Sequence, residues 1–155
     1  MTEAEKYMSQ ALELTDLALE LEEAPIGCVI VYNGEIVGRG YNRRETDQDA
    51  LAHAEILAIE DACKNVGSWR LVDCDMYVTL EPCPMCAGAI INSRIRKVYF
   101  GAYDKKAGSC GSVVNLFELP YNHKPEIQGG VLENECAEKL TSFFRNLREN
   151  KKKTE

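Results

Sequence analysis

The sequence lacks any apolar run that approaches the roughly 18 residues needed to span a membrane. Its N-terminus also lacks the order of a secretory signal, in which basic residues precede an apolar stretch. These two absences argue against membrane insertion and against secretion. We therefore expect a cytoplasmic protein without a membrane partner.

A dense, even set of cysteines is missing as well. The chain has seven cysteines, an odd number spread along its length, unlike the disulfide framework of small secreted proteins. In a reducing compartment, such cysteines are more often core residues or metal ligands. The sequence therefore predicts no disulfides and directs attention to metal binding.

An excess of positive charge is also absent. The net charge of −7 argues against a protein that coats nucleic acid non-specifically, because such binding depends on neutralising phosphates. Basic residues still form two clusters that could contact a phosphate backbone. They are Arg94, Arg96, Lys97, Lys105 and Lys106, and later Arg145, Arg148, Lys151, Lys152 and Lys153. The simpler interpretation of the lysine-rich end is a solvated tail.

Length and composition predict one globular domain. The charged fraction of 28% and the hydrophobic fraction of 45% are close to the globular average, which excludes a disordered or fibrous chain. No internal repeat or linker divides the sequence. We predict a single domain over residues 1–150, followed by a basic tail over residues 151–155.

Hydrophobic periodicity predicts alternating helices and strands. A helix that contains Tyr7 and ends near Glu23 precedes a hairpin, because Asn33-Gly34 is favoured in a type I′ turn. Gly38 and Gly40 indicate a bulge or the close approach of another backbone. The remaining predictions are strands at 26–32, 35–40, 75–80 and 97–102, helices at 53–64, 82–92 and 133–148, and a loop at 103–125 with room for one helical turn. This order predicts an α/β sandwich whose later strands run parallel.

The segment Cys83-Pro84-Met85-Cys86 has the two-residue gap that lets two thiolates bind one zinc ion. The same spacing occurs in redox pairs and in structural zinc sites. Pro84 is favoured in the first turn of a helix, where the helix dipole stabilises thiolates. We therefore interpret the pair as metal-binding.

A second motif is His53-Ala54-Glu55. Two positions along a helix differ by about 200° around its axis, so His53 and Glu55 cannot both face a site beside that helix. A site at the N-terminal end of the helix removes this conflict. Both motifs would then bring helix N-termini to one centre, beyond the carboxyl ends of strands.

His53, Cys83 and Cys86 would supply three protein ligands, the number found in a catalytic zinc site that keeps one position open to water. Such a site lowers the pKa of the bound water to about 7, and Glu55 would move the protons. A fourth ligand would instead close the site and make it structural. The candidates for that ligand are Cys28, Cys74, Cys110 and His123. A redox pair would explain neither His53 nor Glu55.

The combination of His53-Ala54-Glu55 with Pro82-Cys83-Pro84-Met85-Cys86 matches the known signature of zinc-dependent nucleobase deaminases. The chain resembles the cytidine deaminase superfamily, and most closely its bacterial tRNA-specific adenosine deaminases. The zinc motif is shared with deaminases of free bases, so other stretches select the tRNA branch. They include Tyr41-Asn42-Arg43, Trp69-Arg70-Leu71, Gly101-Ala102-Tyr103-Asp104, Asn122-His123 and Phe143-Phe144-Arg145.

The resemblance implies a three-layer α/β/α cytidine deaminase-like fold with a central mixed five-stranded sheet flanked by helices. It implies a homodimer with one Zn²⁺ per subunit, whose second subunit helps to shape the RNA site. The reaction would be hydrolytic deamination of adenosine to inosine at wobble position 34 of an arginine tRNA, bound through its anticodon stem-loop. Glu55 would pass a proton to N1 of adenine and then to the leaving ammonia.

The same resemblance implies substrate-binding roles for other residues. Asn42 would hydrogen-bond the inserted nucleoside, Asp104 would contact the ribose side, and Ile26, Leu80 and Pro82 would belong to the base pocket. The neighbouring bases and backbone of the anticodon loop would meet Asn122, His123, Phe143, Phe144 and Arg145. Asn42 and Asp104 could instead be turn residues. Adjacent residues cannot face the same way on a helix, so at least one of the two phenylalanines is expected in the core.

Two other functions compete with this interpretation. A deaminase of free nucleobases or nucleosides, such as guanine, cytosine or cytidine, would use the same zinc site without RNA. A zinc-stabilised RNA-binding module would hold a four-ligand metal and would not need Glu55.

Overall fold

The structure of the chain, a computed structural model that describes residues 1–154, contains one mixed sheet with strand order β2-β1-β3-β4-β5. The strands are β1 (Gly27–Tyr32), β2 (Glu35–Tyr41), β3 (Cys74–Leu80), β4 (Lys97–Ala102) and β5 (Glu126–Gln128). Strand β1 pairs antiparallel with β2 and β3, whereas β4 pairs parallel with β3 and β5. The mixed five-stranded sheet implied by the resemblance is confirmed.

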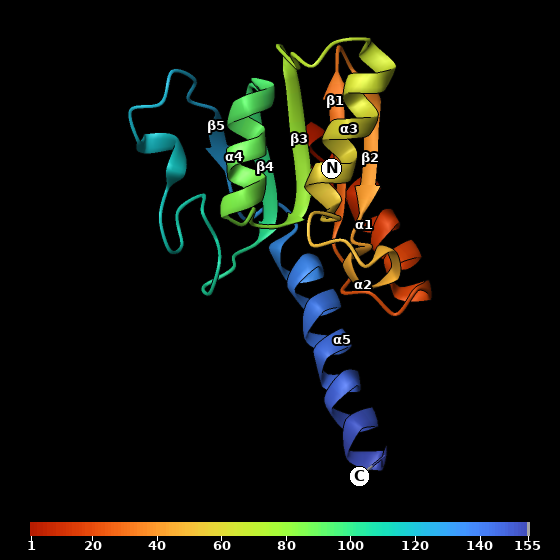
Figure 1. The fold of residues 1–155 in the computed structure, drawn as a ribbon. Helices are drawn as coiled ribbons and strands as arrows, with labels where there is room; N and C mark the ends of the chain where they lie inside the picture. The colour runs from red at the N-terminus through yellow and green to blue at the C-terminus, as the bar shows by residue number, and fades with distance from the viewer. Residues whose placement is uncertain (155) are drawn as a thin grey trace.

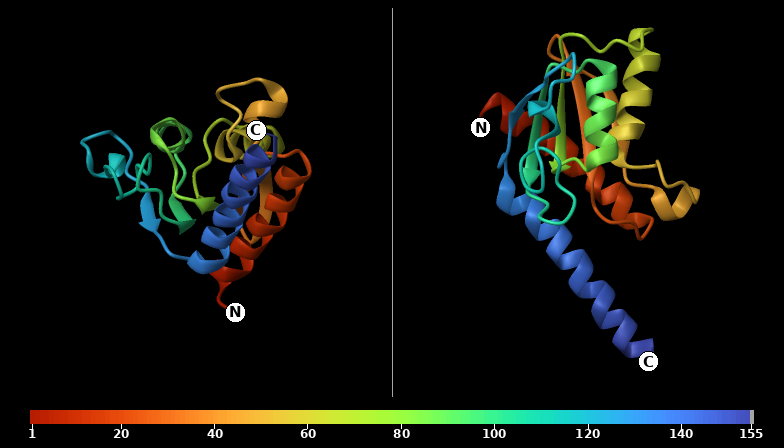
Figure 2. Two further views of the ribbon diagram at one scale, coloured as in Figure 1. Left: turned by 90° about the horizontal axis from the view of Figure 1, so that it is seen from below. Right: turned by 60° about the vertical axis from the view of Figure 1, so that its left-hand side comes forward.

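Helices cover both faces of the sheet (Figure 2). The helices α1 (Glu3–Glu20) and α5 (Glu133–Thr154) lie on one face, and α3 (Ala54–Val66) and α4 (Pro84–Ser93) lie on the other. Alternate residues of β1 point into the two cores. Ile30 packs in the core with α3 and α4, whereas Val29 and Val31 pack in the core with α1. The predicted three-layer fold is therefore confirmed.

The first helix begins at Glu3, where Thr2 and Glu5 form a capping box. The Thr2 hydroxyl accepts a hydrogen bond from the Glu5 N–H at 3.1 Å, and the Glu5 carboxylate accepts one from the Thr2 N–H at 2.9 Å. Helix α1 ends at Glu20, which leaves Glu23 outside it and buried.

The predicted hairpin is confirmed in detail. Asn33 and Gly34 have φ values of 52° and 81°, as a type I′ turn requires. A Cβ atom at Gly38 would overlap the carbonyl oxygen of Ala58, and one at Gly40 would overlap that of Ala54. The two glycines therefore let the backbone of α3 approach β2, which brings the N-terminus of α3 close to the sheet.

Three elements differ from the predictions. The helix α2 (Arg44–Asp47) forms between the predicted strand at 35–40 and the predicted helix at 53–64, where no element was predicted, and the short strand β5 was not predicted from periodicity. Helix α5 continues past Arg148 to Thr154 and projects away from the sheet (Figure 1), so the predicted tail is helical as far as residue 154. The last residue of that tail, Glu155, lies outside the described residues.

A further prediction is confirmed. The long loop contains one short 3₁₀ helix, η1 (Leu116–Glu118). Within residues 1–154, no helix combines the length and the apolar character needed to cross a membrane.

Candidate metal centre and substrate cavity

The candidate metal ligands lie at one edge of the sheet. Strands β2, β3 and β4 run in the same direction, because β1 is antiparallel to both of its neighbours and β4 is parallel to β3. The chain leaves the carboxyl ends of β2 and β3 and enters α3 and α4, whose N-caps are His53 and Cys83 (Figure 1). The structure thus places both motifs at helix N-termini beyond strand ends, as the sequence predicted.

The three ligand atoms converge. The His53 Nδ1 atom lies 3.6 Å from the Sγ atoms of both Cys83 and Cys86. Ligands at about 2.1 Å (nitrogen) and about 2.3 Å (sulfur) from one tetrahedral zinc ion are about 3.6 Å apart, so these side chains fit zinc without rearrangement. In the part of the chain that the structure describes, no fourth His, Cys, Asp or Glu joins this group. The cluster therefore has the ligand count of an open site.

The two thiols are joined by a hydrogen bond and share one negative charge. The hydrogen bond from Cys86, together with the contact with His53, outweighs burial and lowers the pKa of the Cys83 thiol to about 4. The pKa of Cys86 is raised, because its proton is held by Cys83 and its sulfur is buried. The same Cys83 contact raises the pKa of His53. A divalent cation would take the place of the shared proton, since metal ligation requires thiolates.

Glu55 lies in the first turn of α3 and is 4% exposed. Burial disfavours its carboxylate form and raises its pKa to about 7. A carboxyl group with this pKa can both accept and donate a proton near neutral pH. Its position beside His53 and Cys83 suits a proton carrier at the candidate metal centre.

His53, Glu55 and Cys83 line a cavity of about 220 Å³. The predicted substrate-binding residues that also line it are Ile26, Asn42, Leu80, Asp104 and Phe144. Predicted residues that do not line it are Pro82, Asn122, His123, Phe143 and Arg145. Their proposed RNA contacts remain predictions.

Asn42 and Asp104 both stabilise turns, as the alternative interpretation expected, and both line the cavity. The Asn42 Oδ1 atom accepts the Arg44 N–H at 3.2 Å, and the Asp104 Oδ1 atom accepts the backbone N–H groups of Lys106 at 3.0 Å and Ala107 at 3.2 Å. Both residues therefore stabilise turns while lining the cavity. Their remaining polar atoms are the groups that a nucleoside could meet.

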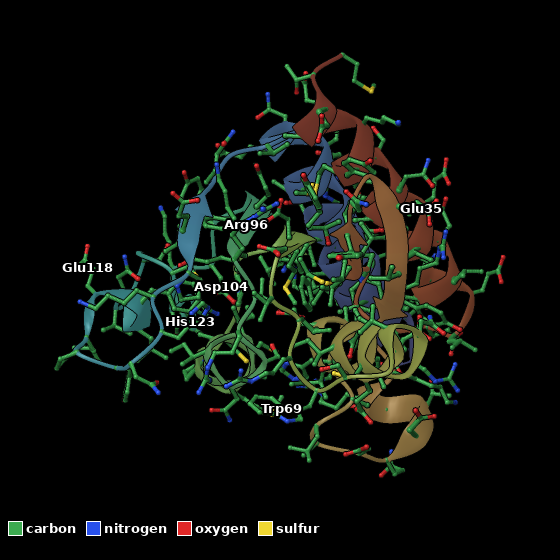
Figure 3. The ribbon with its side chains drawn as sticks, turned by 90° about the horizontal axis from the view of Figure 1, so that it is seen from above. Glu35, Trp69, Arg96, Asp104, Glu118 and His123 are labelled. Atoms are coloured by element: carbon green, nitrogen blue, oxygen red, sulfur yellow. The ribbon has the colours of Figure 1, made fainter. Side chains whose placement is uncertain are left out.

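The prediction that at least one of the two adjacent phenylalanines lies in the core is wrong: Phe143 is half-buried, Phe144 is exposed, and neither belongs to a core cluster. Phe144 lines the cavity and is 45% exposed, whereas Phe143 lines a separate groove with Leu19 and Leu147, between α1 and α5. His123 lies towards the β5 side of the molecule (Figure 3), where its Nε2 atom is 2.7 Å from the Ile95 carbonyl oxygen. Of these three residues, Phe144 is the one that lines the cavity.

The sequence interpretation missed several cavity residues. They are Ala24, Arg44, Ala54, Glu81 and Ala107. Arg44 brings a positive charge to the rim. Glu81 directly precedes the Pro82-Cys83 motif, and its only sequence signal was an acidic residue between an apolar strand and a proline.

Comparison with known proteins agrees with this geometry. Residues 1–102 match the family model of the cytidine and deoxycytidylate deaminase zinc-binding region. A relative from Bacillus subtilis (strain 168), known as tRNA-specific adenosine deaminase, is 53% identical over 153 residues, which cover 98% of this chain and 95% of the relative.

Two solved structures are also similar. One, from a study of A-to-I editing by tRNA:A34 deaminases at the wobble position of transfer RNA, has a TM-score of 0.84 and 45% identity, and covers 87% of this chain and 99% of its own. The other, a guanine deaminase from Bacillus subtilis, has a TM-score of 0.64 and 36% identity, and covers 81% of this chain and 79% of its own. The match is closer to the structure from the RNA-editing study than to the free-base deaminase.

Proposed function

The chain belongs to the tRNA-specific adenosine deaminases of the cytidine and deoxycytidylate deaminase family, and from this premise we propose that it converts adenosine to inosine at wobble position 34 of an arginine tRNA. The observation that carries this function is the open three-ligand cluster of His53, Cys83 and Cys86 beside buried Glu55, at one end of a cavity. Residues 1–150 act as one catalytic domain.

One Zn²⁺ per subunit would be held by the His53 Nδ1 atom and the two thiolates. When bound, zinc supplies a Lewis acid that makes water nucleophilic near neutral pH. The rest of the reaction is proton transfer, for which the chain supplies Glu55.

Glu55 accepts a proton from water as the water oxygen bonds to C6 of adenine, and it delivers that proton to N1. It then moves the proton of the new C6 hydroxyl to the amino nitrogen. The C6–N bond breaks, ammonia leaves, and C6 becomes the carbonyl carbon of inosine. Burial of Glu55 supports this double role, because it keeps the two protonation states close in free energy.

The cavity walls select the nucleoside. Ile26 and Leu80, which line the cavity, would offer apolar contact to the base, Asn42 would offer its amide, and Asp104 would contact the ribose side. Phe144 stacks on a neighbouring base, since single-stranded loops are recognised by aromatic stacking. The RNA beyond the cavity would meet Pro82, Asn122, His123, Phe143 and Arg145.

The protein would act as a cytoplasmic homodimer. Trp69 supports a protein interface, because it is 58% exposed and its ring lies near the guanidinium groups of Arg70 and Arg94, at 5.1 and 5.8 Å. Tryptophan and arginine are enriched at interfaces. In Figure 3, Trp69 lies on the outer side of the α3 and α4 layer.

One experiment tests this function against its two competitors. The purified protein is incubated with an arginine tRNA anticodon stem-loop, and separately with guanine, cytosine and cytidine, while inosine and ammonia are measured. We expect inosine from the RNA and its loss in Glu55→Ala. Turnover of free bases alone would favour the free-base deaminase, and stem-loop binding without turnover would favour the RNA-binding module.

A further inference from the structure

Glu81 is a buried carboxylate that the proposed chemistry does not use. It lies between the end of β3 and the Pro82-Cys83 turn, lines the cavity and is 2% exposed. Carboxylates are rarely buried this deeply unless they are paired or hydrogen-bonded, because burial removes their hydration. The partners of Glu81 therefore indicate what it stabilises.

Its hydrogen-bond partners come from a single segment, residues 104–112. The Oε1 atom accepts the backbone N–H of Asp104 at 3.1 Å and the Ser112 hydroxyl. The Oε2 atom accepts the backbone N–H groups of Cys110 at 3.1 Å and Ser112 at 3.0 Å. One side chain thus binds both ends of this segment.

The loop is folded tightly around this carboxylate. A Cβ atom at Gly108 would overlap the Glu81 carboxyl group and the Asp104 carbonyl oxygen, so only glycine fits at this position. The Ser109 N–H also donates to the Pro82 carbonyl oxygen at 2.8 Å. The 104–112 segment is therefore hydrogen-bonded to both Glu81 and Pro82, the two residues that precede the metal ligand Cys83.

These hydrogen bonds fix the position of Asp104. Its N–H bonds to Glu81, and its carboxylate accepts the N–H groups of Lys106 and Ala107. Asp104 and Ala107 are the residues of the segment that line the cavity.

We propose that Glu81 is a positioning residue that holds the 104–112 segment as a preformed wall of the substrate cavity and so fixes Asp104 for contact with the RNA. The inference rests on the proposed function, because it takes Asp104 as a contact of the substrate. Preorganisation lowers the entropy that is lost when a loop becomes ordered on binding. Loss of the anchor therefore weakens RNA binding more than it slows the chemical step.

The main test is Glu81→Gln, which keeps the shape but turns one acceptor oxygen into an NH₂ group that faces N–H donors. We expect the KM for the anticodon stem-loop to rise about tenfold, the scale of one lost hydrogen bond to a charged group. The kcat should stay within about twofold, and one zinc per subunit should be retained. Glu118→Gln is the matched control, because Glu118 is exposed in the same long loop (Figure 3) and should leave KM unchanged.

A double substitution separates positioning from general loss of stability. If Glu81 acts through Asp104, Glu81→Gln combined with Asp104→Ala should have the same KM as Asp104→Ala alone, because coupled sites are not additive. Additive effects on KM, or a fall in kcat with unchanged KM, would overturn the inference. If Glu81→Gln does not fold, Ser112→Ala removes one partner of the same carboxylate and should raise KM by about threefold.

Hydrogen exchange gives a readout that does not depend on activity. The amides of Asp104, Cys110 and Ser112 should exchange faster in Glu81→Gln than in the native protein, while those of α3 and α4 should not change. Unchanged exchange at the three amides overturns the inference even if the native protein forms no inosine. The absence of inosine would by itself count only against the proposed function.

Discussion

The metal centre and the walls of the cavity beside it are built in different ways. His53 and Cys83 are N-caps of helices that follow sheet strands, so regular secondary structure fixes them. Two segments of the walls, 42–47 and 104–112, are held instead by buried carboxylates that bond to their backbone. Glu23 binds the first segment through Glu45 and Thr46, as Glu81 binds the second.

This difference separates chemistry from recognition. A centre carried by packed helices keeps its geometry whatever the substrate, whereas walls held by a few hydrogen bonds can change independently of it. Substitutions at the centre should therefore lower kcat, and substitutions in the walls should raise KM. The predictions below test this division, in order of decreasing effect.

The largest effect is expected for Cys83→Ala. The substitution removes one of three zinc ligands, so the protein should lose its zinc and its deaminase activity should fall below detection. Zinc content per subunit and inosine formation from the stem-loop measure the two losses. Cys63→Ala is the control, because Cys63 is a half-buried thiol on α3 outside the cluster. Full zinc and activity in Cys83→Ala would contradict the ligand assignment.

Glu55→Gln should leave zinc in place and lower kcat by about a thousandfold, within the range of a lost general acid and base. The change is nearly isosteric, so KM should remain within about threefold of the native value. Single-turnover rates of inosine formation, together with zinc content, provide the measurement. A variant that lost zinc together with activity would show that Glu55 stabilises the metal centre instead of moving protons.

The two regions also differ in how far the sequence predicts them. The metal centre follows from local patterns: His53 and Glu55 lie two positions apart, and Cys83 and Cys86 three positions apart. The hairpin turn at Asn33-Gly34 has a similar local signature. Fixed spacing at the start of a helix determines where such side chains point. To predict the metal centre, one further assumption was enough: that the two helices start at the same edge of the sheet.

The wall anchors could not be predicted in this way. Glu81 bonds to residues 23 to 31 positions away, and Glu23 to residues 22 and 23 positions away. Contacts between residues so far apart in the sequence leave no periodic pattern, and an isolated Glu is normally a surface residue. The short elements α2 and β5 depend on tertiary contacts in the same way, since four and three residues are too few for a pattern.

Among substitutions in the cavity walls, Asn42→Ala should clearly weaken the binding of RNA. It removes the side-chain amide at the cavity and the acceptor of the Arg44 N–H. The KM for the stem-loop should rise about tenfold, with kcat within about twofold. Steady-state kinetics measure both values, and Asn92→Ala, on the exposed side of α4, is the control. A thousandfold loss of kcat would mean that this wall belongs to the chemistry.

The two phenylalanines allow a paired comparison on one helix. Phe144→Ala should raise the KM for RNA about fivefold, the low end for one stacked base, because its ring faces the cavity. Phe143→Ala should raise KM less, by about twofold, because Phe143 lines the groove with Leu19 and Leu147 and would meet RNA only beyond the cavity; loss of its half-buried ring should lower the free energy of unfolding by about 1 kcal/mol. The kinetics and a denaturant titration of both variants test this assignment. Equal effects on KM would show that RNA contacts both sides of α5.

The smallest effect concerns Glu23, the anchor of the first wall. Burial alone disfavours its carboxylate, yet hydrogen bonds from Thr46 and Glu45 outweigh it and hold the pKa of Glu23 below its ordinary value. A carboxyl group whose pKa is lowered by folding stabilises the folded state above its unfolded pKa of about 4.3, and this contribution is lost as the pH falls through the folded pKa.

Glu23→Gln should therefore lower the free energy of unfolding by about 1 kcal/mol at pH 7, the scale of a partly screened charged hydrogen bond. The difference between the two proteins should shrink as the pH falls below about 4, because only the native protein has a carboxylate to protonate. Denaturant titrations of both proteins from pH 7 to pH 3 measure it, and the shared acid sensitivity of the metal ligands cancels in the comparison. A stability difference that does not depend on pH would mean that Glu23 acts through its shape alone, unlike the charged anchor inferred for the other wall.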